Sequence, residues 1–118
     1  MSIGYSQSRS EVADVATEGS NDRVTVELVE KYLDLTARAK EKATPSPTSE
    51  GGDTDATRLA DMLRMCDDYA ADARHFMETG DLVRAFGAIN YAHAWLDAAV
   101  RIGLLDGHGD DQLFTLPP

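Results

Sequence analysis

Three segments of the chain repeat apolar residues with the period of an α-helix. The first spans about residues 24–42, where apolar residues recur at steps of four, four, three and four. The second spans about residues 55–79 and keeps its apolar residues within roughly half of a helix circumference. The third spans about residues 81–105. Because such helices bury their apolar stripes against one another, the pattern predicts an all-α, up-and-down three-helix bundle over residues 22–105.

Residue types that end and begin helices lie between the second and third segments. Gly80 can adopt the left-handed conformation that ends a helix, and Asp81 can accept a hydrogen bond from the first turn of the next helix. A break this short predicts an antiparallel hairpin of two helices. We also expect Asn21 or Asp22 to cap the first helix, and the third helix to end near Gly107.

The other segments lack helical periodicity. Residues 1–21 are rich in Ser, Glu and Gly and are expected to be disordered. Residues 43–54 combine Pro, Ser, Thr and Gly, which predicts a flexible loop between the first two helices. Residues 106–118 form a C-terminal tail that either folds back over the third helix, docks on a partner or stays loose. The apolar residues of this tail are Leu113, Phe114 and Leu116.

The third helical segment has a narrow polar strip. On a helical wheel Asn90, Asp97, Arg101 and Ala94 fall close together, and apolar residues lie on both sides of them. A peripheral helix usually shows a broad polar face. We therefore expect something besides the other two helices to cover this one: the C-terminal tail, a second subunit or another protein. The predicted interface residues are Trp95, Ile102, Phe114 and Leu116.

The charge of the chain indicates its environment. Of 118 residues, 21 are Asp or Glu and 11 are Lys or Arg, which gives a formal net charge of −10. Such a surface repels itself at low ionic strength, and molar salt screens that repulsion. The composition favours a halophilic protein from a salt-filled cytosol over an ordinary acidic protein. We expect no direct binding to nucleic acid, because the chain has no cluster of Lys and Arg.

Sequence signals for export and membrane insertion are missing. The first 20 residues contain no apolar run typical of a signal peptide, and no segment approaches the roughly 18 apolar residues of a membrane span. Cys66 is the only cysteine, which excludes an internal disulfide and suits a reducing cytosol. We therefore expect a cytoplasmic protein that does not insert into a membrane.

One stretch of the chain is similar to a known family. Residues 75–105, HFMETGDLVRAFGAINYAHAWLDAAVRIGLL, closely resemble the signature of the archaeal domain of unknown function 357 family. The resemblance covers about residues 22–105, and Ala94 stands where the family often carries Gly. It implies a small up-and-down three-helix bundle and no established activity. Some relatives carry the domain beside a cytidylyltransferase-like domain, which implies an accessory role near nucleotide chemistry.

The candidate chemistry lies on the third helix. His93 and Asp97 are one turn apart, and a carboxylate that orients an imidazole occurs in general-base catalysis and in metal sites. A histidine beside apolar residues is more often a hydrogen-bonding residue between helices. No nucleophile is suitably placed, and no His or Cys pair has metal-site spacing, so we predict no catalytic residue, metal or cofactor. The candidate pocket or interhelix polar cluster comprises Asn90, Tyr91, His93, Asp97 and Arg101.

Two functions stay open. The first is a non-enzymatic interaction or adaptor module that forms a homodimer or binds an unknown protein partner through the third helix. The alternative is an accessory subunit or small-ligand binder associated with nucleotidyltransferase or RNA metabolism, with a nucleotide as its ligand.

Overall fold

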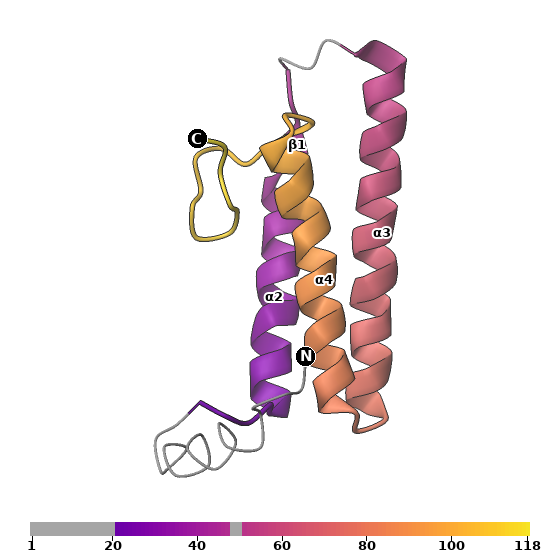
Figure 1. Ribbon diagram of the computed structural model, residues 1–118, viewed down its shortest axis with the longest axis vertical. Coiled ribbons are helices and arrows are strands. Elements are labelled where there is room, and N and C mark those ends of the chain that lie inside the picture. Colours follow the sequence, from indigo (N-terminus) through magenta and orange to yellow (C-terminus); the bar gives the residue numbers. More distant parts are fainter. Residues whose placement is uncertain (1–20, 48–50) are drawn as a thin grey trace, which may run out of the picture.

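The computed structural model describes residues 21–47 and 51–118. Its helices are α2 (Val26–Lys42), α3 (Gly52–Glu78) and α4 (Leu82–Arg101), and Figure 1 shows them lying side by side along their length. Most of the contacts between helices join α4 to α3 and α4 to α2. The prediction of an all-α three-helix bundle is confirmed. The predicted disordered segment, residues 1–21, lies outside the described residues except for its last position.

The core is built mainly from small and medium apolar side chains. On α4 the fully buried residues include Ile89 and Leu96, which rank among the largest side chains in the core. Burying one such side chain contributes roughly 1.5–3 kcal/mol. Alanines fill much of the remaining contact, so the helices can approach closely. The fully buried residues are Val29, Ala39, Cys66, Ala73, Ala85, Ile89, Ala92, Leu96 and Ala99.

One shared turn ends α3 and begins α4. Gly80 has a φ of +83°, and the main-chain N–H of Asp81 donates to the oxygen of Phe76 at 2.8 Å. The N–H of Gly80 donates to the oxygen of Met77 at 3.2 Å, which completes a Schellman motif. The carboxylate of Asp81 then accepts a hydrogen bond from the N–H of Arg84 at 3.2 Å. Asp81 therefore closes one helix and caps the next, and the two helices turn back on each other.

The start of α2 differs from the prediction. Thr25, with an extended backbone, is the N-cap, and its hydroxyl accepts a hydrogen bond from the N–H of Leu28 at 3.1 Å. The predicted caps, Asn21 and Asp22, are wrong because they lie three or more residues before the first helical residue, Val26. A threonine also caps helices, so the sequence contained this signal.

The end of α4 was predicted too late in the chain. The helix ends at Arg101 and not near Gly107. Gly103 has a φ of +84°, and the N–H of Leu104 donates to the oxygen of Ala99 at 2.9 Å, which forms a second Schellman motif. Leu104 and Leu105 are buried after the turn, so their apolar character extends the helical pattern past the true end of the helix.

A short β-bridge joins the loop after α2 to the chain after α4. Strand β1 (Thr44–Pro45) pairs antiparallel with β2 (Leu105–Asp106), and the N–H of Ser46 donates to the oxygen of Leu104 at 2.9 Å. The prediction of a flexible loop over residues 43–54 is therefore wrong at both ends of that segment, since α3 already begins at Gly52. Residues 48–50 lie outside the described residues. The pairing joins residues about sixty positions apart, so no local pattern predicts it.

Candidate functional site

The C-terminal tail lies against α4 and is held by three side chains that are spaced one turn apart. His93 Nε2 lies 2.7 Å from the main-chain oxygen of Leu113 and, because a carbonyl only accepts, carries the proton. Asp97 accepts a hydrogen bond from the N–H of Thr115 at 2.9 Å. Arg101 donates to the main-chain oxygen of Leu116 at 3.3 Å. All three contacts bind main-chain groups of the tail, which Figure 1 shows beside α4.

Apolar burial and one ion pair fix the tail in place. Leu113 and Phe114 are 6% and 4% exposed, and the ring of Phe114 lies so close to Gly107 that a Cβ added there would be 2.9 Å from Phe114 Cδ2. Asp110 accepts hydrogen bonds from the N–H groups of residues 112 and 113 and pairs with Lys42 Nζ at 2.8 Å. The bond to Lys42 is the main cause that lowers the pKa of Asp110. Of the three alternatives for the tail, the structure shows the first.

The imidazole of His93 also reaches α2. Its Nδ1 lies 3.0 Å from the hydroxyl oxygen of Thr36, a buried residue. Nδ1 and the Thr36 hydroxyl share this hydrogen bond, so the ring contacts α2 through Nδ1 and the tail through Nε2. Asp97 lies 3.8 Å from His93 Nε2, so the structure brings these two predicted residues together. Both ring nitrogens are occupied by contacts within the chain, and this geometry is that of a structural link between α2, α4 and the tail.

The other members of the predicted polar cluster lie elsewhere on α4. Tyr91 is 48% exposed, and its ring packs edge-on against Tyr69 of α3 with ring centres 4.5 Å apart. Asn90 is exposed and donates to the main-chain oxygen of Phe86 at 2.8 Å. The structure therefore does not gather Tyr91, His93 and Asp97 around one point.

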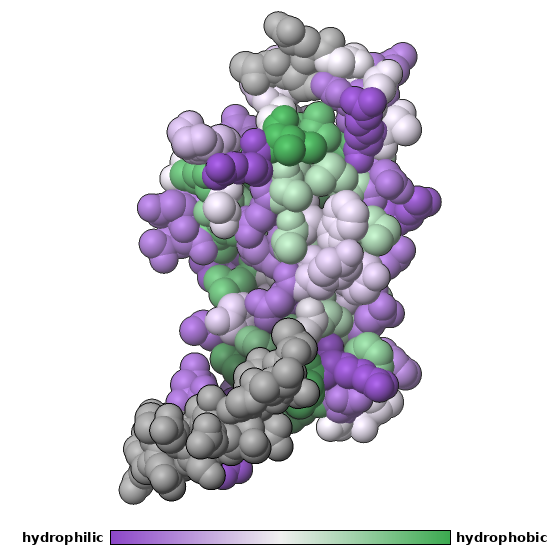
Figure 2. Space-filling model, in the orientation of Figure 1, coloured by the Kyte–Doolittle hydropathy of each residue, from purple (hydrophilic) through white to green (hydrophobic). Residues whose placement is uncertain are grey.

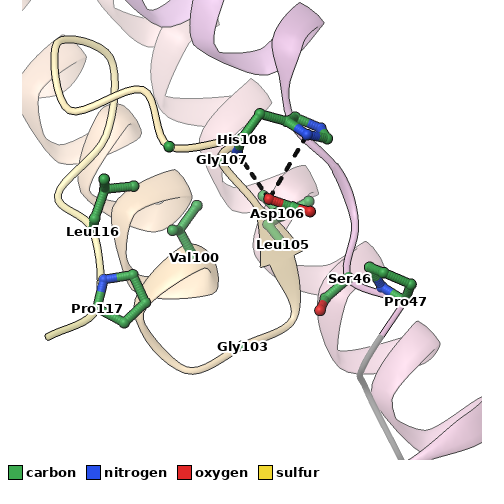
Figure 3. A pocket seen from close by; sticks show the side chains of 11 residues that line it. Ser46, Pro47, Val100, Gly103, Leu105, Asp106, Gly107, His108, Leu116 and Pro117 are labelled. Atoms are coloured by element: carbon green, nitrogen blue, oxygen red, sulfur yellow. Dashed lines mark hydrogen bonds and ion pairs between the residues drawn. The ribbon is translucent and has the colours of Figure 1, made fainter.

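A cavity of about 430 Å³ lies between the tail, β2 and the loop after β1 (Figure 3). Val100, Leu116 and Pro117 form an apolar part of its lining. The main-chain N–H of His108 donates to Asp106 at 2.8 Å, and the ring Nε2 of His108 lies 2.8 Å from the hydroxyl of Thr44. These polar contacts join the loop after β2, which contains His108, to β1 and β2.

The described residues contain neither a candidate metal-binding group nor a candidate membrane span. No group of three His, Cys, Asp or Glu side chains there is placed to hold a metal ion. Within the same residues, no helix combines the length and the apolar character needed to cross a membrane.

The exposed positions of α4 and of its C-cap, Ile102, lie along one side of the helix, which is called the outer face. Of the large apolar side chains exposed in the described residues, three of four belong to it: Val83 at 74%, Tyr91 at 48% and Ile102 at 64%. Figure 2 shows light-green, weakly hydrophobic atoms over the upper part of α4. The outer face consists of Val83, Arg84, Gly87, Asn90, Tyr91, Ala94, Ala98, Arg101 and Ile102.

The outer face differs from the rest of the surface in charge. It contains two arginines and no carboxylate, although the structure describes every residue of α4. The one carboxylate of α4, Asp97, is bound by the tail. The exposed positions of the other two helices carry many carboxylates, among them Glu27, Glu30 and Asp34 on α2 and Asp61, Asp68 and Asp72 on α3.

The predicted interface residues fall into two groups. Ile102 is on the outer face, and Trp95 borders it, half-buried, with an indole N–H that has no hydrogen-bond partner within the described part of the chain. Phe114 is inside the chain, and Leu116 is half-buried on the tail.

A family model described as "Protein of unknown function (DUF357)" matches residues 31–105, well over half of the chain. The chain belongs to the DUF357 family. The resemblance predicted from the sequence is therefore confirmed. No curated protein matches the chain, and no solved structure does.

The DUF357 match covers most of α2 and all of α3 and α4, and it ends where β2 begins. Residues 106–118, which bind His93, Asp97 and Arg101, follow the matched region. The outer face, by contrast, lies within it. The sequence pattern placed the narrow strip of α4 at Asn90, Asp97, Arg101 and Ala94, and this strip contains only part of the outer face. The signal was the spacing of Gly87, Ala94 and Ala98, small residues that repeat on one side of the helix.

Proposed function

We propose that this DUF357 protein is a non-enzymatic interaction module that docks on another protein chain through the outer face of α4. The observation that carries the proposal is the clustering of Val83, Tyr91 and Ile102 on one exposed helix face. Gly87, Ala94 and Ala98 lie between these three side chains on the same face, and exposed apolar side chains gathered on one face favour an interaction site. That this face also lacks carboxylates, in a chain of net charge −10, supports the same conclusion.

No specific observation favours the alternative, a nucleotide-binding accessory subunit. Its candidate residues were Tyr91, His93 and Asp97. The imidazole and carboxylate of that group bind Thr36 and the tail, and Tyr91 packs against α3. A nucleotide would have to displace these contacts before it could use the two titratable side chains.

The proposal is tested by placing a photo-crosslinking amino acid at position 94 of the full chain, in the cells that produce it natively. Ala94 is exposed at the centre of the outer face. The matched control is position 71, an exposed alanine of α3 beside the carboxylate of Asp72. Irradiation should give protein adducts from position 94 and none from position 71. Adducts absent at position 94, or equally abundant at both positions, would contradict the proposal.

A further inference from the structure

We infer that the chain seated on the outer face is a second copy of this protein, with the two α4 helices packed antiparallel about a two-fold axis. This inference rests on the proposed function and names the partner of the same surface. The axis passes beside the midpoint between Ala92 and His93, which is also the midpoint of the outer face from Val83 to Ile102. In a symmetric dimer each contact occurs twice, so the face must be complementary to itself.

The sizes of the side chains satisfy that condition. Residues equally far from the midpoint lie opposite each other, so Val83 faces Ile102 of the second copy at either end of the contact. Gly87 faces Ala98 of the second copy, where two small residues allow the backbones to approach. The ring of Tyr91 then faces Ala94 of the second copy near the axis, so a large side chain is placed over a small one. Helices with such contacts pack with axes roughly 8–10 Å apart.

Charge also favours a second copy over a foreign basic partner. Two chains of net charge −10 repel each other least where neither presents a carboxylate, and the outer face is such a surface. A basic partner would instead be attracted to the exposed carboxylates of α2 and α3. The antiparallel arrangement also places the positive end of one helix dipole beside the negative end of the other.

The two arginines of the outer face lie opposite each other in this arrangement. Arg84 Nε is 3.6 Å from a carboxylate oxygen of Asp81, and Arg101 donates to the main-chain oxygen of Leu116. Each guanidinium is therefore held by its own chain at the edge of the contact. Arg84 also sits over the ring of Phe76, 5.9 Å from its centre, which directs it away from the middle of the face.

The test uses two full-length variants, Gly87→Cys and Ala98→Cys, mixed in molar KCl and oxidised. In the antiparallel pair these positions are opposite, within reach of a disulfide. Position 87 of one copy lies opposite position 98 of the other, which is eleven residues from position 87 of that copy. The two positions 87 are therefore about 16 Å apart along the helix axis. A Cβ at Gly87 meets no atom within 4 Å, so the cysteine fits. Burial and the nearby Asp67 raise the pKa of Cys66 to about 11, so that thiol stays unreactive.

We expect the mixture to form a covalent dimer several-fold faster than either variant alone, and faster than a mixture containing the surface control Ala71→Cys. Faster crosslinking of Ala98→Cys with itself would indicate a parallel pair and overturn the inference. Crosslinking no faster than in the Ala71→Cys control would overturn it as well. If position 94 nevertheless gives photo-adducts with a different protein, the proposed function stands and only the identity of the partner is wrong.

Discussion

His93 of α4 donates a hydrogen bond to the main-chain oxygen of Leu113 in the C-terminal tail, across a distance of 2.7 Å. The other nitrogen of the same ring is bonded to Thr36 of α2. One imidazole therefore joins three segments that are far apart in the sequence. It follows that the tail is part of the packed structure of α2 and α4, and that the outer face is the side of α4 that stays exposed.

Replacing His93 with alanine should destabilise the chain by about 1–3 kcal/mol, because the buried hydroxyl of Thr36 and the carbonyl of Leu113 would each lose a partner. Urea denaturation followed by circular dichroism measures this change. His75→Ala is the control, since His75 is an exposed residue of α3. Surface changes of that kind usually alter stability by about 0.5 kcal/mol or less. An equal effect of the two substitutions would show that the His93 link does not hold the tail.

Gly107 and Phe114 should be coupled energetically. Gly107→Ala places a Cβ 2.9 Å from the ring of Phe114 and should destabilise the chain by about 1–3 kcal/mol through overpacking. Phe114→Ala should cost about 3–5 kcal/mol, because it empties a buried site. In the double variant the methyl group added at position 107 has room, so the cost of Gly107→Ala should vanish. A double-mutant cycle from denaturation curves checks this, and additive costs would contradict the contact.

The parts of the fold that the sequence predicts depend on local signals. Helical periods and the Gly80–Asp81 pair are readable along the chain, and they suffice for the bundle and its hairpin. The position of the tail is not readable in this way, because α4 binds its main chain, and main-chain groups leave no mark on residue type. The outer face was missed for a related reason. Gly87 and Ala98 count as apolar in a pattern, yet small residues are also common on protein surfaces.

Gly87 and Gly103 should respond in opposite directions to the same substitution. An added Cβ meets no atom within 4 Å at either site, so backbone conformation alone distinguishes them. Gly103 has a φ of +84°, and alanine there should cost about 1–2 kcal/mol. Gly87 is inside a helix, where alanine should stabilise by about 0.5–1 kcal/mol. Thermal melts at low protein concentration measure both changes. Equal signs would mean that α4 does not end as described.

The contribution of Asp110 should depend on pH in a defined direction. Its pKa in the folded chain is lowered below the ordinary value of 3.8, chiefly by the hydrogen bond from Lys42. A lowered pKa means that the carboxylate stabilises the folded chain above pH 3.8, and that this stabilisation is lost as the pH falls through the folded value. Many other carboxylates titrate in the same range. The difference in melting temperature between the natural chain and Asp110→Asn isolates the effect of this residue. We expect this difference at neutral pH, and we expect it to disappear in acid. A constant difference would contradict the ion pair.

Salt should stabilise this chain, and the carboxylates of α3 should be a main reason. Asp68 and Asp72 are exposed, of like charge and one turn apart, an arrangement that destabilises a helix. At about 1 M salt the Debye length falls to roughly 3 Å, so the repulsion is screened. Melting temperatures should therefore rise between about 50 mM and about 2 M KCl.

The variant Asp68→Asn/Asp72→Asn should melt higher than the natural chain at low salt and lose that advantage at high salt. Asp67→Asn is the matched control, because Asp67 is paired with Lys40 and its removal relieves no repulsion between carboxylates of this pair. Salts also strengthen apolar burial, and that effect would raise all three melting curves alike. If the Asp68→Asn/Asp72→Asn variant melts above the natural chain at low salt and at the same temperature at high salt, and Asp67→Asn does not behave in this way, charge repulsion explains the effect of salt.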